Sequence, residues 1–369
     1  IQDQIQNLEV DRELTRYQPL QDQVQMAELP DVEIIDMREE LKAGNRSIFS
    51  LALQEKLQGV LDREEQAILF LNRRGSSTHV FCRDCGYALV CPRCDRSLTY
   101  HRGQSALRCH HCGYTRGMPS RCPSCGGSRI RQLGTGTEEV EDTLQKRFPG
   151  IRTLRWDQDT TRKKGSHRRI MEAFSDYQAD VLVGTQMLAK GLDLPLVTLV
   201  GVVLADMGLH LPDYRTDERT FQILTQVAGR AGRSPLGGSV ILQTFQPDHF
   251  VIRTAARHDY RAFYKQEIAH RRELGYPPFT NLVRLETRHR QQQKARRTTR
   301  EYAEKIKDWM ENEGYSATQM IGPVPCYFER IRGEYRWQII LRGPDPANLF
   351  RDRHPDPDWR IEINPPSLL

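Results

Sequence analysis

Short apolar runs alternate with amphipathic stretches through the middle of the chain. The runs at Ala67–Leu71 and Val181–Val183 are continuously apolar, which is typical of strands buried on both faces. Between them, the stretch 138–148 repeats its apolar residues with a helical spacing of four. This alternation predicts an α/β fold with a parallel sheet that is covered by helices on both faces. Further strands are expected at 129–133, 151–156, 197–204 and 239–245, and further helices around 170–174 and at 217–232.

The pattern changes after Phe245. A helix predicted at 253–273 is broken by Gly275-Tyr-Pro-Pro278, because proline cannot continue a helix. Strand candidates at 281–286, 326–331 and 336–341, with a basic helix around Arg296 and Arg300, then predict a small α+β domain. The sequence thus predicts a connector over 1–50 with one strand candidate at Val32–Ile35, an α/β lobe over 51–81 and 127–250, an insertion over 82–126, and a C-terminal domain over 251–369.

Composition limits the possible classes of protein. The 369 residues allow two or three domains, and no run of about 18 apolar residues is present, so no membrane span is expected. The chain begins at Ile1 without a basic stretch leading into an apolar segment, so we expect a cytoplasmic protein and part of a longer chain. The formal net charge is +6. It falls to about +2 if eight cysteines hold two Zn²⁺ as thiolates, so charge is weak evidence for an anionic partner.

Eight of the nine cysteines form four CxxC pairs within 44 residues, and Cys326 stands apart. A two-residue gap lets both sulfurs of a pair face one ion, and two pairs complete a tetrahedral zinc site. A disulfide framework and a redox CxxC pair are the alternatives, but no export signal is present and a redox site needs a single pair. Four pairs therefore predict two structural zinc ions. The pairs are Cys82/Cys85, Cys91/Cys94, Cys109/Cys112 and Cys122/Cys125.

The spacing of the pairs favours one of the three possible combinations. Fourteen residues separate Cys94 from Cys109, close to the interval of about 15 to 20 in zinc ribbons. The inner pairs would then share one zinc, and the outer pairs would share the other. His101, His110 and His111 are interpreted as ordinary surface residues, because four thiolates already complete each site.

The segment Gln226-Val-Ala-Gly-Arg-Ala-Gly-Arg233 is the most informative in the chain. On a helix, Gln226, Arg230 and Arg233 project from one face. Two guanidiniums on a helix rich in small residues suit a phosphate chain, because arginine offers fixed donors that match phosphate oxygens. The alternative is an exposed helix whose arginines form surface ion pairs.

Three other segments lie next to predicted strands. Gly184-Thr-Gln-Met-Leu-Ala-Lys-Gly-Leu-Asp193 follows a buried strand, at the edge where open α/β sheets bind ligands. Leu71-Asn-Arg-Arg-Gly75 also follows a strand, and Gly134-Thr-Gly-Thr-Glu138 opens a helix with free backbone N–H groups. Together with the Gln226–Arg233 helix, they predict a ligand site along the strand ends of one sheet.

With these motifs in place, the sequence resembles the PriA (primosomal protein N′) family of superfamily 2 DNA helicases from about Leu29 to Leu341. The resemblance is carried by the eight cysteines, GTGTEEVE at 134–141, GTQMLAKGLD at 184–193, ERTFQILTQVAGRAGR at 218–233 and RRELGYPPF at 271–279. It implies a second RecA-like helicase lobe with an inserted two-zinc ribbon, followed by a C-terminal domain similar to a ribosomal-protein fold.

The resemblance also implies roles for single residues. Arg230 and Arg233, with Gln226 on the same helix, would act on ATP, and Gly191 and Asp193 would couple nucleotide to motion. The DNA backbone would lie along Thr185 and the loop Gly134, Thr135, Gly136 and Thr137, with Arg73 near it, and the ribbon would contact DNA and partner proteins. Expected partners are forked and single-stranded DNA, single-strand DNA-binding protein and proteins that load the replicative helicase. No membrane contact is expected, and the protein is expected to be a monomer.

The chain departs from the family in two ways. The family commonly reads KGHDF where this chain has Leu192 and Leu194, which puts any role of the histidine or phenylalanine in doubt. No GxxxxGK[ST] loop or acidic box is present, so half of the site for ATP and Mg²⁺ is expected in a first lobe outside this sequence. The resemblance therefore implies part of an ATP-dependent 3′-5′ DNA helicase for replication restart, and the missing half of the ATP site predicts that this chain is inactive alone. A zinc-dependent DNA-binding scaffold is the alternative, and a zinc-ribbon chaperone or redox protein would leave the Gln226–Arg233 helix unexplained.

Overall fold

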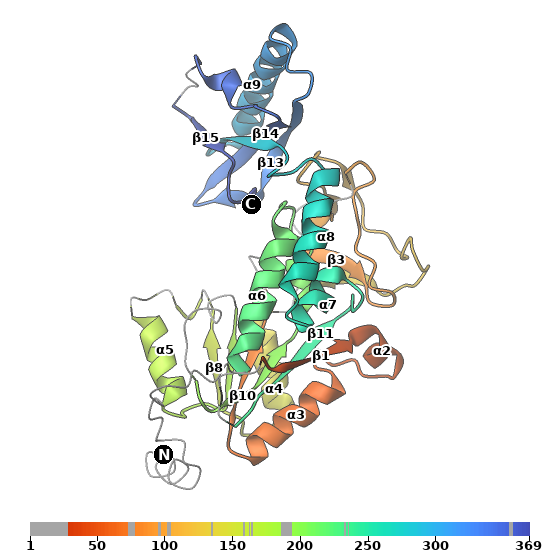
Figure 1. Cartoon of the computed structure of the whole chain (residues 1–369), viewed down its shortest axis with the longest axis vertical. Helices are drawn as coiled ribbons and strands as arrows, with labels where there is room; N and C mark the ends of the chain where they lie inside the picture. The colour runs from red at the N-terminus through yellow and green to blue at the C-terminus, as the bar shows by residue number, and fades with distance from the viewer. Residues whose placement is uncertain are drawn as a thin grey trace.

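The computed structural model describes residues 29–72, 78–94, 97–101, 105–133, 136–157, 159–161, 163, 165–185, 194–231, 234, 236–353 and 357–369. It contains a parallel sheet, an antiparallel ribbon and an antiparallel C-terminal sheet (Figure 1). The parallel sheet confirms the predicted α/β lobe. Its strand order is β1 (Asp31–Asp36), β11 (Ser239–Thr244), β10 (Val197–Val202), β2 (Gln66–Phe70), β9 (Val181–Gly184) and β8 (Thr153–Trp156).

Helices cover both faces of this sheet because alternate strand residues point to opposite sides. In β2, Ile68 and Phe70 contribute to one core cluster, and Ala67 and Leu69 contribute to the other. The first cluster is covered by α5 (Ser166–Ser175), α6 (Thr216–Ala231), α7 (Phe250–Ala256) and α8 (Tyr260–Glu273). The second is covered by α2 (Met37–Lys42), α3 (Leu51–Asp62) and α4 (Thr137–Arg147).

The lobe extends further at both ends than the sequence indicated. Strand β1 is an edge strand of the sheet, paired in parallel with β11 over its whole length. At the other end, Val251, Ile252 and Phe263 lie in the same core cluster as the sheet. From this packing we propose that the lobe begins near residue 30 and ends with α8, instead of spanning 51–250. The helix predicted at 253–273 is two helices, because residues 257–259 turn the chain between α7 and α8.

The zinc ribbon is a five-stranded antiparallel sheet with strand order β6 (Thr115–Arg116), β5 (Ala106–Arg108), β4 (Thr99–His101), β3 (Thr78–Cys82) and β7 (Ile130–Leu133). The segment predicted as a lobe strand at 129–133 is β7, and it belongs to the ribbon because it pairs with β3. The ribbon lies against the end of β11, where the rings of Phe81 and Phe245 are 4.8 Å apart. Gly86 has φ +76°, and a Cβ there would lie 2.2 Å from the Phe245 carbonyl oxygen, so only glycine permits this approach.

The C-terminal domain has the predicted α+β architecture. Its antiparallel strand order is β13 (Gln319–Ile331), β14 (Glu334–Gly343), β12 (Asn281–His289) and β15 (Trp359–Ile363). The helix α9 (Gln292–Asn312) packs Tyr302 and Ile306 against Val283 and Ile339 of the sheet. Strand β15 was not predicted, because its residues Trp359-Arg-Ile-Glu-Ile363 follow a segment rich in proline and charge.

The opposite face of the C-terminal sheet holds a buried cluster of charges around Glu286. The Glu286 side chain is 1% exposed. It accepts hydrogen bonds from Arg284 at 2.7 Å, Arg288 at 2.8 Å and both Nε and Nη2 of Arg336. Burial alone would raise the pKa of Glu286, but the hydrogen bond from Arg336 and the charges of Arg284 and Arg336 outweigh it and hold the pKa at about 2.

We expect Glu286→Gln to destabilise the C-terminal domain by about 3–5 kcal/mol, because it leaves buried arginines without their carboxylate. The native carboxylate has a lowered pKa, so its contribution is fully present above the ordinary value of 4.5 and is lost as pH falls toward 2. Urea unfolding at pH 7 and between pH 5 and pH 2.5 checks both statements. A Gln variant whose stability matches the parent at pH 7 would contradict them, and the exposed Glu304→Gln is the control.

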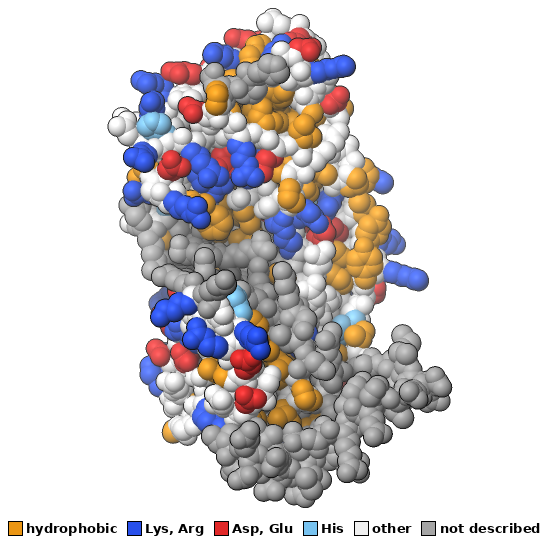
Figure 2. Space-filling model, turned by 90° about the vertical axis from the view of Figure 1, so that its left-hand side faces the viewer, with side chains coloured by type: hydrophobic (Ala, Val, Ile, Leu, Met, Phe, Trp, Pro, Cys, Tyr) orange, Lys and Arg blue, Asp and Glu red, His pale blue; other side chains and the backbone are white. Residues whose placement is uncertain are grey.

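No helix in the described ranges is both long enough and apolar enough to cross a membrane. Figure 2 shows basic side chains that are interleaved with acidic ones on the visible face. This distribution agrees with the small net charge expected once the cysteines are thiolates.

Candidate zinc and nucleotide sites

The outer zinc site is formed by Cys82, Cys85, Cys122 and Cys125. The Sγ atoms of Cys82 and Cys125 are 3.7 Å apart, those of Cys85 and Cys122 are 3.8 Å apart, and all four lie within 4.8 Å of one another. The first sulfur of each pair also accepts a backbone N–H from the residue two positions later, at 3.4 Å. Two turns of the ribbon therefore present four thiols to one point, as a tetrahedral ion requires.

The inner zinc site is formed by Cys91, Cys94, Cys109 and Cys112. The Sγ of Cys91 lies 3.6 Å from that of Cys112 and 3.8 Å from that of Cys94, which in turn lies 3.9 Å from that of Cys109. The nested pairing predicted from the spacing is confirmed. The donor set fits zinc, because four soft thiolates in this arrangement select Zn²⁺, and a closed four-thiolate shell offers no position for catalytic water.

One of the three histidines near the inner site was interpreted wrongly. His110 is 4% exposed and therefore is not a surface residue. Its Nε2 lies 2.9 Å from Nε2 of His101, and its Nδ1 lies 3.4 Å from the carbonyl oxygen of Pro325 in the C-terminal domain. His110 therefore helps to attach the ribbon to that domain, a contact between distant segments that local sequence does not reveal.

The carboxyl edge of the parallel sheet holds the described residues that were predicted to contact DNA. Thr185 follows β9, and its N–H donates to the carbonyl oxygen of Trp156 at the end of the neighbouring strand β8. Thr137 begins α4 at the same edge, where its hydroxyl donates to Asp157 at 2.6 Å. Gly136 is the N-cap of α4 and makes no side-chain cap, so it leaves backbone N–H groups open there.

The Leu71 motif lies at this carboxyl edge as well. The N–H of Leu71 donates to the carbonyl oxygen of Gly184, and Asn72 follows. A Cβ on Gly208 would lie 2.0 Å from Asn72 Nδ2 and 2.6 Å from the hydroxyl oxygen of Thr220 on α6. This close packing ties the motif after β2 to the first turns of α6.

The predicted arginine site lies at the opposite, amino edge. Helix α6 begins near the carboxyl edge, and its 16 residues extend about 24 Å back along the sheet. Arg230 is therefore close to Ser234, whose hydroxyl donates to the carbonyl oxygen of Pro195, just before β10. Thr185 lies at the carboxyl edge, whereas Leu194 comes just before Pro195 at the amino edge. The sequence predicted that the motifs with Thr185 and Arg230 lie at strand ends, but it did not distinguish the two edges of the sheet. The direction of α6 shows that Thr185 and Arg230 lie at different edges.

The described residues of α6 do not all share one environment. Gln226 is exposed, and Arg230 is only 8% exposed. A Cβ on Gly229 would meet no described atom within 4 Å, so this helix end has open space beside it. Leu194, where the family commonly has phenylalanine, is 5% exposed in the sheet core, which explains an apolar residue there.

Six of the predicted site residues and Leu192 lie outside the described residues. Their contacts therefore stay predictions from the sequence. They are Arg73, Gly134, Thr135, Gly191, Asp193 and Arg233.

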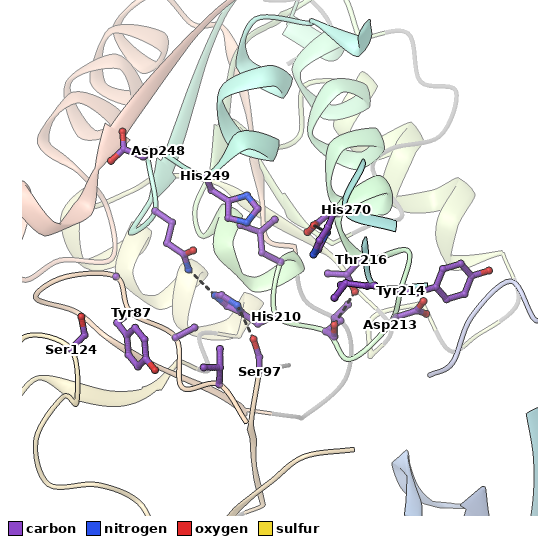
Figure 3. Close-up of a pocket in the computed structure, with 18 of the residues that line it drawn as sticks. Tyr87, Ser97, Ser124, His210, Asp213, Tyr214, Thr216, Asp248, His249 and His270 are labelled. Atoms are coloured by element: carbon purple, nitrogen blue, oxygen red, sulfur yellow. Dashed lines mark hydrogen bonds and ion pairs between the residues drawn. The ribbon is translucent and has the colours of Figure 1, made fainter. Parts of the chain in front are cut away.

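A cavity of about 550 Å³ lies between the ribbon and the lobe, and residues of α8 also line it. Figure 3 shows His210 in its wall, between Ser97 of the ribbon at 3.3 Å and Gln246 at 2.9 Å. His249 lines the same cavity, and burial lowers its pKa to about 4, so it is neutral near pH 7. No motif or periodicity in the sequence pointed to these residues, and their histidine identity was the only signal for them.

Three family models match the chain. The helicase conserved C-terminal domain matches residues 127–235, the PriA DNA helicase Cys-rich region matches 91–116, and the primosomal protein N C-terminal domain matches 272–366. The last match begins near the end of α8, which agrees with the packing of most of that helix against the lobe.

Curated relatives match nearly the same length of chain. Replication restart protein PriA of Bacillus subtilis is 48% identical over 87% of this chain and 39% of its own length. PriA of Synechocystis is 46% identical over 89% of this chain and 40% of its own length, and PriA of Chlamydia pneumoniae is 40% identical over 85% and 42%. The chain thus spans about two fifths of the length of these relatives. With its helicase C-terminal lobe, Cys-rich region and C-terminal domain in that order, the chain belongs to the PriA family of replication restart proteins.

Proposed function

We propose that this chain is the part of an ATP-dependent 3′-5′ DNA helicase that supplies the second motor lobe, and that ATP binds between this lobe and a first lobe. The observation that carries the proposal is the position of Arg230. It lies in the last turn of α6, and the hydroxyl of Ser234, four residues further along, donates to the carbonyl oxygen of Pro195. We propose that the nucleotide binds at this amino edge, where Arg230 and Pro195 lie.

The chemistry required of this lobe is electrostatic. Phosphoryl transfer spreads negative charge over the transferred group, and a guanidinium held in a partly dry site stabilises that charge without reorganising. Arg230, Arg233 and Gln226 would act there, and Gly191 and Asp193 would couple the nucleotide to motion. The P-loop lysine and the carboxylate for Mg²⁺ would come from the first lobe.

DNA would lie at the other edge of the sheet. Support comes from the open N–H groups at Gly136 and from Thr185, which both lie at the carboxyl edge. Such contacts recognise the backbone and not the base sequence. Closure of the lobes on ATP at one edge would then move the residues that hold DNA at the other. Arg73 and the loop Gly134–Thr137 belong to the same proposed surface.

The proposed biological role is restart of stalled replication on forked DNA. The ribbon would supply a rigid surface for DNA and for partners such as single-strand DNA-binding protein and the proteins that load the replicative helicase. The motor is proposed to act as a cytoplasmic monomer.

We expect the 369-residue chain alone to show no ATP hydrolysis above background, with or without forked DNA, since Arg230 cannot hold Mg²⁺ and a triphosphate by itself. A longer natural chain that includes a first lobe should hydrolyse ATP, and forked DNA should stimulate it. A coupled assay on both proteins checks this. DNA binding by the longer chain with no stimulated hydrolysis would reject the motor and favour the zinc-dependent scaffold.

A further inference from the structure

A cleft of about 580 Å³ separates the inner zinc knuckle from the C-terminal domain. Its ribbon wall includes Arg108, Cys112 and Thr115, and its other wall is formed by α9 and β13. An ion pair at one end holds the walls together, since Arg108 Nη1 lies 3.2 Å from Glu329 Oε2. The cleft is therefore built from two modules that are far apart in the sequence.

The wall formed by α9 carries a stripe of side chains that can donate hydrogen bonds. Gln292, Arg296 and Arg300 are spaced by four residues and line the cleft together with Gln293. Arg296 and Arg300 are exposed, and neither has an ion pair with any described carboxylate. Arg297, the residue after Arg296, instead forms an ion pair, with its Nε 3.7 Å from Oε1 of Glu301. Helical periodicity therefore separates the cleft arginines from those that have acidic partners.

Two further features favour an anion in this cleft. Helix α9 begins here without a side-chain cap and without an acidic residue in its first turn, so its first N–H groups and positive dipole end are open. Trp337 also lines the cleft, is 9% exposed, and has a buried Nε1 with no hydrogen-bond acceptor among the described residues. A buried N–H donor without an acceptor indicates a missing polar partner.

The positive charge that is free to meet a ligand lies on α9. Of the described lining residues, Arg108, Arg296 and Arg300 are cationic, Glu329 is acidic, and Cys112 belongs to the inner four-thiolate site. With its zinc that site carries a charge of about −2. Glu329 is already engaged, because it accepts hydrogen bonds from Arg108 and, at 2.7 Å, from Gln292. Positive charge therefore remains on α9.

We propose that this cleft binds the phosphodiester backbone of nucleic acid, with Arg296 and Arg300 as the phosphate contacts. The stripe from Gln292 to Arg300 extends about 12 Å along α9, which is long enough to contact more than one phosphate of a strand. The proposal rests on the proposed DNA helicase function and adds a second contact region. The ribbon and the C-terminal domain both lie beyond the carboxyl edge of the lobe, where the first DNA contacts are placed (Figure 1).

The test is the double variant Arg296→Gln/Arg300→Gln in the longer natural protein with both zinc ions bound. Its matched control is Arg297→Gln/Lys307→Gln, which removes two charges from the same helix where they have acidic partners. Fluorescence anisotropy with forked DNA is measured across a series of salt concentrations. The cleft variant should bind about tenfold more weakly at low salt, and the slope of log K against log salt should decrease in magnitude by about 1.8. The control should stay within about twofold of the parent.

A second variant, Trp337→Phe, keeps the ring and removes the N–H, and it should weaken fork binding about threefold, within the range for loss of one hydrogen bond. Equal affinity and slope in the cleft variant and its control would overturn the proposal. A loss of inorganic phosphate binding with unchanged DNA affinity would show a small-anion site and would also overturn it. If the parent protein does not bind forked DNA at all, the proposed function itself fails, which is a distinguishable result.

Discussion

Replacing Arg230 with alanine in a longer chain that carries the first lobe is expected to lower DNA-stimulated ATP hydrolysis by about 10³-fold or more. A guanidinium that stabilises charge on the transferred phosphoryl group contributes about this much in related phosphoryl-transfer enzymes. The loss should appear in kcat more than in KM, because the interaction is strongest in the transition state. Steady-state assays with saturating forked DNA measure both constants.

The buried position of Arg230 requires a control for folding. Arg230→Lys keeps a charge and most of the volume but loses the bidentate geometry, so it should fold as the parent and remain strongly impaired. Arg168→Ala on α5 removes an arginine whose side chain is 85% exposed and should leave hydrolysis unchanged. If the Arg230 variants turn over ATP within about threefold of the parent, the assignment of this residue is wrong.

Loss of one cysteine from either zinc site is expected to halve the zinc content and to disorder the ribbon. Structural zinc contributes about 10–16 kcal/mol to folding in small zinc domains, so a three-thiolate site should not hold this ribbon. Cys85→Ser and Cys94→Ser should each reduce zinc from two to one per chain in elemental analysis. Hydrogen exchange should then increase over 78–133, and the lobe should keep its protection.

Cys326 supplies the matched control. It is fully buried in the C-terminal domain, and burial raises its pKa to about 11, so it stays a neutral thiol at pH 7. Cys326→Ala should retain two zinc ions. Two zinc ions in either ligand variant, or an ordered ribbon after chelation, would contradict the structural role.

The sequence predicted most of the lobe because its strands are continuous apolar runs of the length that a parallel sheet buries. The limits predicted for β2, β9 and β11 agree with the structure to within one residue at each end. The strand at 129–133 was assigned to the wrong sheet, because its composition does not reveal whether β3 or a lobe strand pairs with it. The zinc pairing was predictable because a knuckle is local and the intervals between knuckles limit which pairs can meet.

The amino-acid sequence by itself determined the two four-cysteine sites, the α/β class of the lobe and the family to which the chain belongs. Tertiary structure alone decided that Thr185 and Arg230 lie at opposite edges of one sheet, because this depends on the length and direction of α6. It also decided that His110 and Arg108 of the ribbon meet Pro325 and Glu329 of the C-terminal domain. Such contacts join segments more than 200 residues apart, and no periodicity in either segment encodes its partner.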